Sequence, residues 1–134
     1  MSTETVVVPS WPPPKGYANG QIGRGPVLHV AGQVGWTSPG VFPAKDLLGQ
    51  FAQALDNVLA VVHAAGGKIA DIASMTVYVT DVVAYRSSTR GLGPIWKARM
   101  GQHYPAMALV AVSALVEPEA VVEIQVVAYL EHVE

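Results

Sequence analysis

The sequence predicts a single α+β domain in which two helices cover one face of one mixed β-sheet. Three observations support this prediction. The 134 residues are 51% apolar and only 13% charged, which suffices for one hydrophobic core. Two segments repeat apolar residues at helical spacing, and several short segments alternate or run apolar as strands do. In chain order they read strand, strand, helix, strand, helix, strand, strand.

The N-terminal part of the chain predicts two strands separated by an irregular segment. Residues 5–9 form a short β-prone run, and residues 27–34 form a longer strand that ends at a glycine-containing turn. Three consecutive prolines exclude regular structure over 10–16. The glycines that follow match neither of the phosphate-binding spacings, so we expect no phosphate site there.

The middle of the chain predicts a helix followed by a strand. Residues 44–65 carry an apolar stripe at three- and four-residue steps, and Gly66-Gly67 ends the pattern. Residues 72–80 alternate as a strand, with Met75 and Val77 on one face and Tyr78 on the other.

A second helix is expected after this strand, and it ends near residue 100. Asp81 or Ser88 begins it, and Gly101 is a natural stop. Pro94 lies within the segment. We therefore expect either that the first part is a separate turn or that the helix proper begins near the proline.

The C-terminal part predicts an antiparallel pair of strands. An apolar run to residue 116 and a β-rich run over 121–127 are joined by a short turn that contains Pro118. Glu123 interrupts the second run and shares a strand face with Gln125. An ionised carboxylate is costly to bury unless it is paired or has a task. Two interpretations stay open: a solvated strand face, or a face that lines a site.

Charge and residue usage exclude several functional classes. The net charge is −2 and the eight basic residues are scattered, so we expect no nucleic-acid partner. The chain has no cysteine and its four histidines lack ligand spacing, so neither a metal site nor a cofactor is expected. The first residues do not resemble a signal peptide, and no apolar run approaches the roughly 20 residues that span a bilayer. We expect a cytoplasmic protein that does not contact membranes and hides apolar surface in an oligomer.

Seven short motifs follow one another along nearly the whole chain: Gly16-Tyr17-Ala18-Asn19-Gly20, Val30-Ala31-Gly32-Gln33-Val34, Gln53-Ala54-Leu55-Asp56-Asn57-Val58, Ala64-Ala65-Gly66-Gly67, Val77-Tyr78-Val79-Thr80-Asp81, Tyr104-Pro105-Ala106 and Val121-Val122-Glu123-Ile124. In this order they resemble the Rid family of reactive-intermediate deaminases, the RidA-like enamine/imine deaminases. From this resemblance we expect residues 1–134 to form a single Rid-like domain. It implies a chorismate-mutase-like α+β fold, a homotrimer, and small-molecule sites in the clefts between subunits.

The resemblance also implies roles for two residues. Glu123 matches the family's glutamate that holds the attacking water and shuttles protons. Hydrolysis of a C=N bond needs such a water and a group that takes and returns a proton. Tyr17 matches a tyrosine whose ring packs against a planar substrate and whose hydroxyl can donate. Loop packing is the alternative for Tyr17.

Met107 departs from the family pattern. Members with demonstrated deaminase activity have an arginine directly after Tyr-Pro-Ala, where it binds the substrate carboxylate. Methionine offers a flexible apolar surface and a weakly accepting sulfur instead. The segment between residues 81 and 104 is also longer than in the archetypes, with Trp96 near the usual position of an asparagine that faces the site. The expected substrate contacts are Met107, Ala31, Gln33, Trp36 and Trp96, with the trimer interface as the alternative for Trp36. Strand alternation predicts that Ala31 and Gln33 lie on one face.

Two functions remain open from the sequence. The first is a deaminase that hydrolyses an enamine or imine to a carbonyl and ammonia, with a substrate less dependent on an α-carboxylate. The second is a non-catalytic trimer that binds metabolites or partner proteins, as a chaperone does, through the same clefts. The retained Glu123 favours the enzyme and the missing arginine favours the binder. The charge pattern gives no support for nuclease activity.

Overall fold

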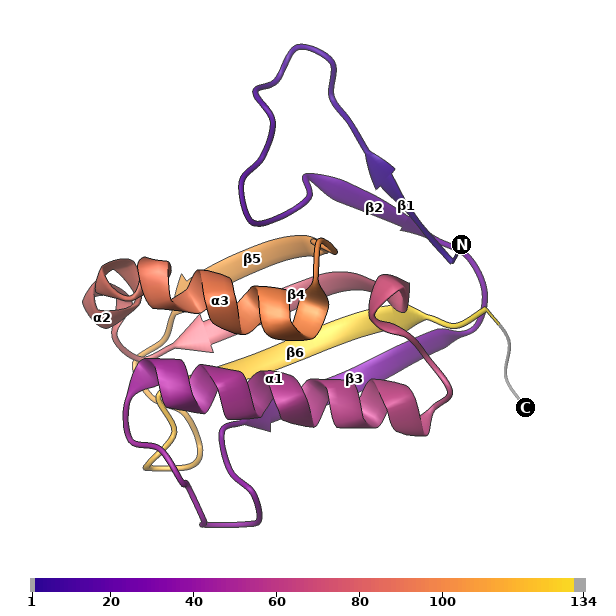
Figure 1. The fold of residues 1–134 in the computed structure, drawn as a ribbon. Coiled ribbons are helices and arrows are strands. Elements are labelled where there is room, and N and C mark those ends of the chain that lie inside the picture. The colour runs from indigo at the N-terminus through magenta and orange to yellow at the C-terminus, as the bar shows by residue number, and fades with distance from the viewer. Residues whose placement is uncertain (1, 132–134) are drawn as a thin grey trace.

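The computed structural model describes residues 2–131 of the chain. In chain order its elements are β1 (Thr3–Val6), β2 (Gly20–Gly23), β3 (Val27–Val34), α1 (Leu47–Ala64), the 3₁₀ turn η1 (Ile69–Asp71), β4 (Ile72–Val79), α2 (Val82–Ser87), α3 (Thr89–Met100), β5 (Ala106–Ala111) and β6 (Val122–Tyr129). Helices α1 and α3 lie together on one face of the main sheet, and the β1–β2 hairpin stands apart from it (Figure 1).

The main sheet has four strands in the order β3-β6-β4-β5. Strand β6 is antiparallel to both of its neighbours, whereas β5 runs parallel to β4. This confirms the predicted α+β architecture, one mixed sheet with two helices on one face.

The predicted antiparallel pairing at the C-terminus is wrong, because β4 lies between the two strands. Thr76 of β4 pairs with Ala108 of β5 on one side and with Gln125 of β6 on the other. The chain passes from β4 through α2 and α3 to β5, a crossover that makes these strands parallel. β5 ends at Ala111 rather than near residue 116, and the ten residues before β6 carry the chain past β4.

The core lies between the sheet and the two helices. Val122, Ile124 and Val126 of β6 are almost fully buried, while Glu123 and Gln125 between them point to the other face. The strand alternation expected around Glu123 is therefore confirmed. We call the face that carries Glu123 and Gln125 the open face, because neither α1 nor α3 covers it (Figure 1).

Helix α1 begins three residues later than predicted. Asp46 is its N-cap, with extended backbone and a carboxylate that accepts from the Gly49 N–H at 3.4 Å. The helix ends at Ala64, and Gly66 then adopts a φ of 83°, a left-handed conformation that favours glycine. The two glycines thus stop the helix as the sequence predicts.

Both candidate starts of the second helix are used. Asp81 caps α2 by accepting from the Ala84 N–H at 3.0 Å, and Ser88 precedes α3. The expectation that the helix proper begins near Pro94 is wrong, since α3 begins at Thr89 and runs through the proline. Pro94 removes only one helical hydrogen bond, and the burial of Trp96 stabilises the remainder of the helix against the core.

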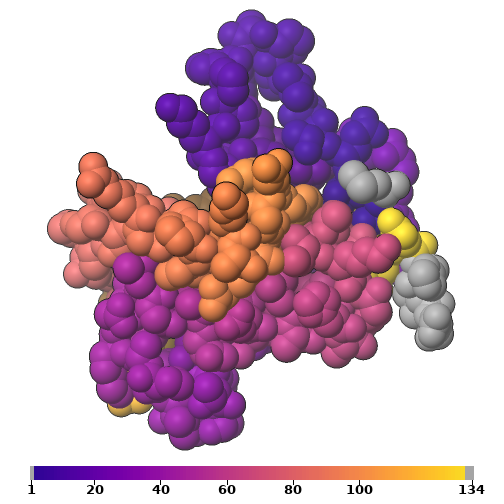
Figure 2. Space-filling model, viewed as in Figure 1, coloured from indigo at the N-terminus to yellow at the C-terminus, as the bar shows by residue number. Residues whose placement is uncertain are grey.

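The N-terminal segment forms a hairpin that the sequence predicts only in part. β1 pairs with β2, for which no strand was expected, in a sheet of its own. Its start is held to the domain by Thr3 Oγ1, which donates to the Ala70 carbonyl at 2.6 Å, and by a hydrogen bond from Ser2 to Asp71. The loop over residues 7–19 projects beyond the rest of the molecule (Figure 2).

Over residues 2–131, no helix combines the length and apolarity needed to cross a membrane. Within the same residues, no cluster of three or more histidine, aspartate or glutamate side chains is arranged to hold a metal ion.

Candidate functional site

A cavity of about 450 Å³ lies between the N-terminal loop, helix α3 and strand β5. Its walls are mainly aromatic and apolar. We call it the aromatic cavity, and define it by the lining residues Lys15, Tyr17, Tyr85, Trp96, Tyr104 and Met107.

Met107 lies on the helix-facing side of β5. It pairs in register with Met75 of β4, which is buried in the core beneath the helices. Since paired residues of adjacent strands share a face, Met107 points into the aromatic cavity and away from the open face. This position gives the cavity an apolar, adaptable floor.

Tyr17 reaches the cavity because the N-terminal loop docks on the beginning of β5. The Ala18 N–H donates to the Pro105 carbonyl at 2.9 Å, and Ala18 forms a parallel bridge with Ala106. Gln21 Nε2 adds a bond to the Tyr104 carbonyl at 3.1 Å. Tyr17 is 42% exposed and lines the cavity, so its ring is accessible to a ligand.

Trp96 and Tyr104 line the cavity as a pair. Their ring centroids are 5.9 Å apart and their planes differ by 4°, a stacked arrangement. Trp96 Nε1 donates to the His103 carbonyl at 3.2 Å, which fixes the indole. Burial raises the pKa of the Tyr85 phenol in α2, so this hydroxyl stays protonated and can donate.

Glu123 lies on the open face, where it pairs with Tyr78 of β4 and Val34 of β3. It is partly buried, and its carboxylate lies directly over Gly32: a methyl group at Gly32 would overlap Oε2 and lie 2.7 Å from Cδ. The missing side chain at Gly32 therefore provides the space that the carboxylate occupies.

The structure separates the predicted site residues into two groups. Tyr17, Trp96 and Met107 meet in the aromatic cavity, whereas Glu123 lies on the opposite face of the same sheet. Within one chain these two groups do not form a common site.

The remaining predicted contacts come from β3 and the turn after it, and neither Gln33 nor Trp36 lines the cavity. A bulge between Val30 and Gln33 interrupts the strand alternation on which a shared face for Ala31 and Gln33 depended. Gln33 Nε2 donates to the Ala31 carbonyl at 3.1 Å, and Ala31 is exposed. Trp36 packs against Phe42, with centroids 6.0 Å apart, in a small second cluster.

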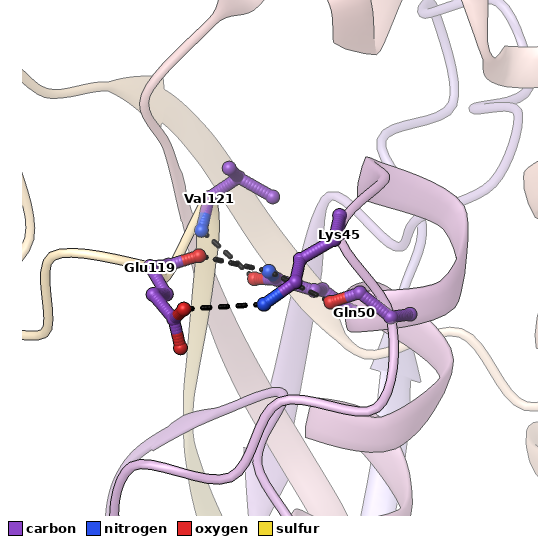
Figure 3. A network of polar contacts seen from close by, with 5 residues as sticks. Lys45, Gln50, Glu119 and Val121 are labelled. Carbon is purple, nitrogen blue, oxygen red and sulfur yellow. Dashed lines mark hydrogen bonds and ion pairs between the residues drawn. The ribbon is translucent and has the colours of Figure 1, made fainter.

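A buried glutamine fixes the chain just before the strand that carries Glu123. Gln50 of α1 is fully buried, and its Nε2 donates to the Glu119 carbonyl at 2.9 Å and to the Ala44 carbonyl at 3.2 Å. Its Oε1 accepts from the Val121 N–H at 2.9 Å (Figure 3). An exposed ion pair from Lys45 to Glu119, 3.1 Å long, lies beside it. This Gln50 network holds the start of β6 in place.

Sequence reasoning missed several of these residues. Gln50 could have been noticed in the sequence, because it is a polar side chain on the helix face that packs into the core. Lys15 directly precedes the Gly-Tyr motif, and Tyr104 is the first residue of Tyr-Pro-Ala, so both neighbour motif residues. Nothing in the sequence indicated Tyr85, because its approach to the cavity depends on how α2 packs.

Comparisons with known proteins agree with this fold. Residues 10–130 match the family described as Endoribonuclease L-PSP. The chain belongs to the endoribonuclease L-PSP family. A RutC family protein of Pyrococcus horikoshii is 29% identical over 129 residues, covering 96% of this chain and 98% of the relative.

Solved structures extend the family assignment. A member of the conserved Rid protein family, YyfB from Yersinia pestis, is 28% identical with a TM-score of 0.82, covering 97% of this chain and 100% of that one. The YjgF gene product from E. coli is 27% identical with a TM-score of 0.69, covering 96% and 99%. These similarities confirm the Rid-like membership that the sequence motifs indicated.

Proposed function

We propose that this Rid-like protein is an imine or enamine deaminase that produces a carbonyl compound and ammonia. The observation that carries the proposal is the Glu123 carboxylate, held over Gly32 on the open face. A partly buried carboxylate beside exposed backbone can hold a water molecule and exchange protons with it.

The proposed reaction uses Glu123 twice. As the oxygen of water bonds to the imine carbon, Glu123 takes a proton from the water, and the C=N electron pair moves to nitrogen, which receives that proton. The carbinolamine then gives its hydroxyl proton to Glu123, which passes a proton to nitrogen. The oxygen electron pair forms the carbonyl as the C–N bond breaks, so that nitrogen leaves as ammonia. An enamine enters the same sequence after a proton moves from nitrogen to carbon.

The proposed enzyme is an oligomer, because the two groups of site residues face in different directions in one chain, and the family resemblance implies a homotrimer. A site that combines them needs the aromatic cavity of one subunit against the open face of the next. The open face offers apolar surface for this contact, since Val110 is 43% exposed and Val27 is 49% exposed. Burying such surface between subunits is favourable.

The cavity also supports a substrate that differs from a small α-imino acid. Met107 cannot form the paired hydrogen bonds that a guanidinium makes with a carboxylate. Tyr17, Trp96 and Tyr104 instead offer flat apolar surface. A larger, planar imine gains contact area from these rings and depends less on a charged anchor at β5.

A second candidate function is a non-catalytic trimer that binds small metabolites or a partner protein through the same clefts. Met107 favours it, because an apolar cavity without the arginine still binds planar molecules.

Ammonia release decides between the two functions. The purified protein is supplied with freshly generated 2-aminoacrylate and with a bulky planar imine, and light scattering reports whether three chains associate. Glu123→Gln should leave the assembly intact and lower turnover by about 10²-fold, because the amide cannot accept and return the proton. Glu117→Gln, an equal charge change just before β6, is the matched control. Unchanged turnover in Glu123→Gln would make Glu123 a residue of the strand face only. A wild type that binds imines without releasing ammonia would support the second function.

A further inference from the structure

Lys15 gives the aromatic cavity its charge. Among the described residues that line this cavity it is the single charged side chain, and no carboxylate accompanies it. The other side chains that line it are uncharged, and most are aromatic or apolar. A cavity with one cation and no anion favours a negatively charged ligand over a neutral one of the same shape.

The position of Lys15 depends on the same docking that positions Tyr17. Gly16, between them, has a φ of 79°, a left-handed conformation that favours glycine, and Ala18 is fixed beside β5 by its bond to Pro105. The prolines at 12–14 restrict the chain on the other side. The backbone of Lys15 is therefore held on both sides, while its flexible side chain can place the ammonium group over the mouth of the cavity.

The ammonium group of Lys15 is available for a ligand. Over residues 2–131 the ion pairs of the other lysines include Lys45 with Glu119 and Lys68 with Glu131, but Lys15 joins neither an ion pair nor a side-chain hydrogen bond. Its side chain is exposed, so binding an anion there does not require breaking an internal contact.

We propose that Lys15 binds the carboxylate of the ligand at the mouth of the aromatic cavity, and that the ligand is a planar aromatic or unsaturated carboxylate. The inference rests on the proposed function for one point only, that this cavity receives the substrate. The stacked pair of Trp96 and Tyr104 offers a ring face to the planar part, and the ammonium neutralises the charge that would otherwise be costly to bring beside apolar walls.

This arrangement separates the charge from the floor of the cavity. Lys15 belongs to the N-terminal loop and Met107 to β5, so they form different walls. A ligand that touches both has its carboxylate at one end and an apolar part at the other. The favoured ligand is therefore longer than the smallest imino acids, whose carboxylate is attached to the reacting carbon.

The test compares trans-cinnamate with cinnamamide, its neutral and nearly isosteric counterpart, by isothermal titration calorimetry at low ionic strength. Wild type should bind cinnamate about two- to fivefold more tightly, the range for an ion pair that is still largely solvated. Lys15→Met should abolish this preference and leave cinnamamide binding unchanged. Lys15→Arg should retain the preference. Lys97→Met, which removes an exposed charge of α3 outside the cavity lining, is the matched control and should retain it as well.

Salt provides a second measurement on the wild type. At about 1 M salt the Debye length falls to about 3 Å, so the preference for cinnamate should shrink while cinnamamide binding persists. Equal affinities for the two probes, a preference that survives Lys15→Met, or no binding of either probe would each overturn the proposal. None of these measurements needs turnover, so a failure to release ammonia would count against the deaminase and leave the role of Lys15 standing.

Discussion

Replacing Gly32 with alanine displaces the Glu123 carboxylate without changing its chemistry. The added methyl group would overlap Oε2 and lie 2.7 Å from Cδ, whereas ordinary contacts begin at 3.4 Å. The carboxylate must therefore move by about 1 Å, and misplacement by this amount can cost about 10²-fold in rate. The backbone at Gly32 has no left-handed φ, so alanine is tolerated there.

We expect Gly32→Ala to lower ammonia release by about 10²-fold while thermal unfolding and assembly stay close to wild type. Gly20→Ala is the matched control, because a methyl group on that strand glycine meets the Val6 side chain at an ordinary 3.4 Å. The assay measures kcat and KM for the best imine substrate, with circular dichroism on the same samples. If Gly32→Ala keeps full turnover, the position of the Glu123 carboxylate does not matter for the reaction and the proposed mechanism is refuted.

Three further predictions follow from the site and its support. Met107→Arg should raise activity on 2-aminoacrylate by about ten- to a hundredfold, because a hydrogen bond to a charged group contributes about 1.5–3 kcal/mol; equal rates in wild type and variant would mean that another residue already binds the carboxylate. Gln50→Leu removes three buried hydrogen bonds and should lower the free energy of unfolding by about 3 kcal/mol in denaturant titrations. The control Gln53→Leu on the same helix should cost less than about 1 kcal/mol. Equal losses in the two variants would exclude a special role for the Gln50 network. Because burial raises the pKa of Tyr85, the folded chain keeps a proton that the unfolded chain releases above pH of about 10. The free energy of unfolding should therefore fall as pH rises beyond that value, and it should fall less steeply in Tyr85→Phe.

Periodicity in the sequence predicted which residues are buried, because burial depends on local alternation. The open-face position of Glu123 and the buried stripe of α1 both follow from such patterns. The pairing of strands does not follow from such local patterns. The placement of β4 between β5 and β6 depends on where the crossover returns, and no residue of the C-terminal turn encodes that choice. The helix start predicted near Pro94 was wrong for a related reason. The packing of Trp96 in the core outweighs the one backbone hydrogen bond lost at Pro94.

The site was predicted as a set of residues but not as an arrangement. The family motifs located Tyr17, Met107 and Glu123, but strand parity places Met107 and Glu123 on opposite faces only once the register of three strands is known. The bulge in β3 is likewise a property of two strands together, so Ala31 and Gln33 could not be assigned to faces from their spacing.

The docking of the N-terminal loop on β5 has a consequence for solubility. β5 is an edge strand of the main sheet, and unpaired edge strands recruit other chains and promote aggregation. Ala18 occupies the beginning of that edge through its bridge to Ala106. The segment that forms one wall of the cavity thus also shields a sheet edge from self-association. Loop substitutions that widen the cavity for bulkier ligands would loosen this shield, so a broader ligand range would come with a greater tendency to aggregate.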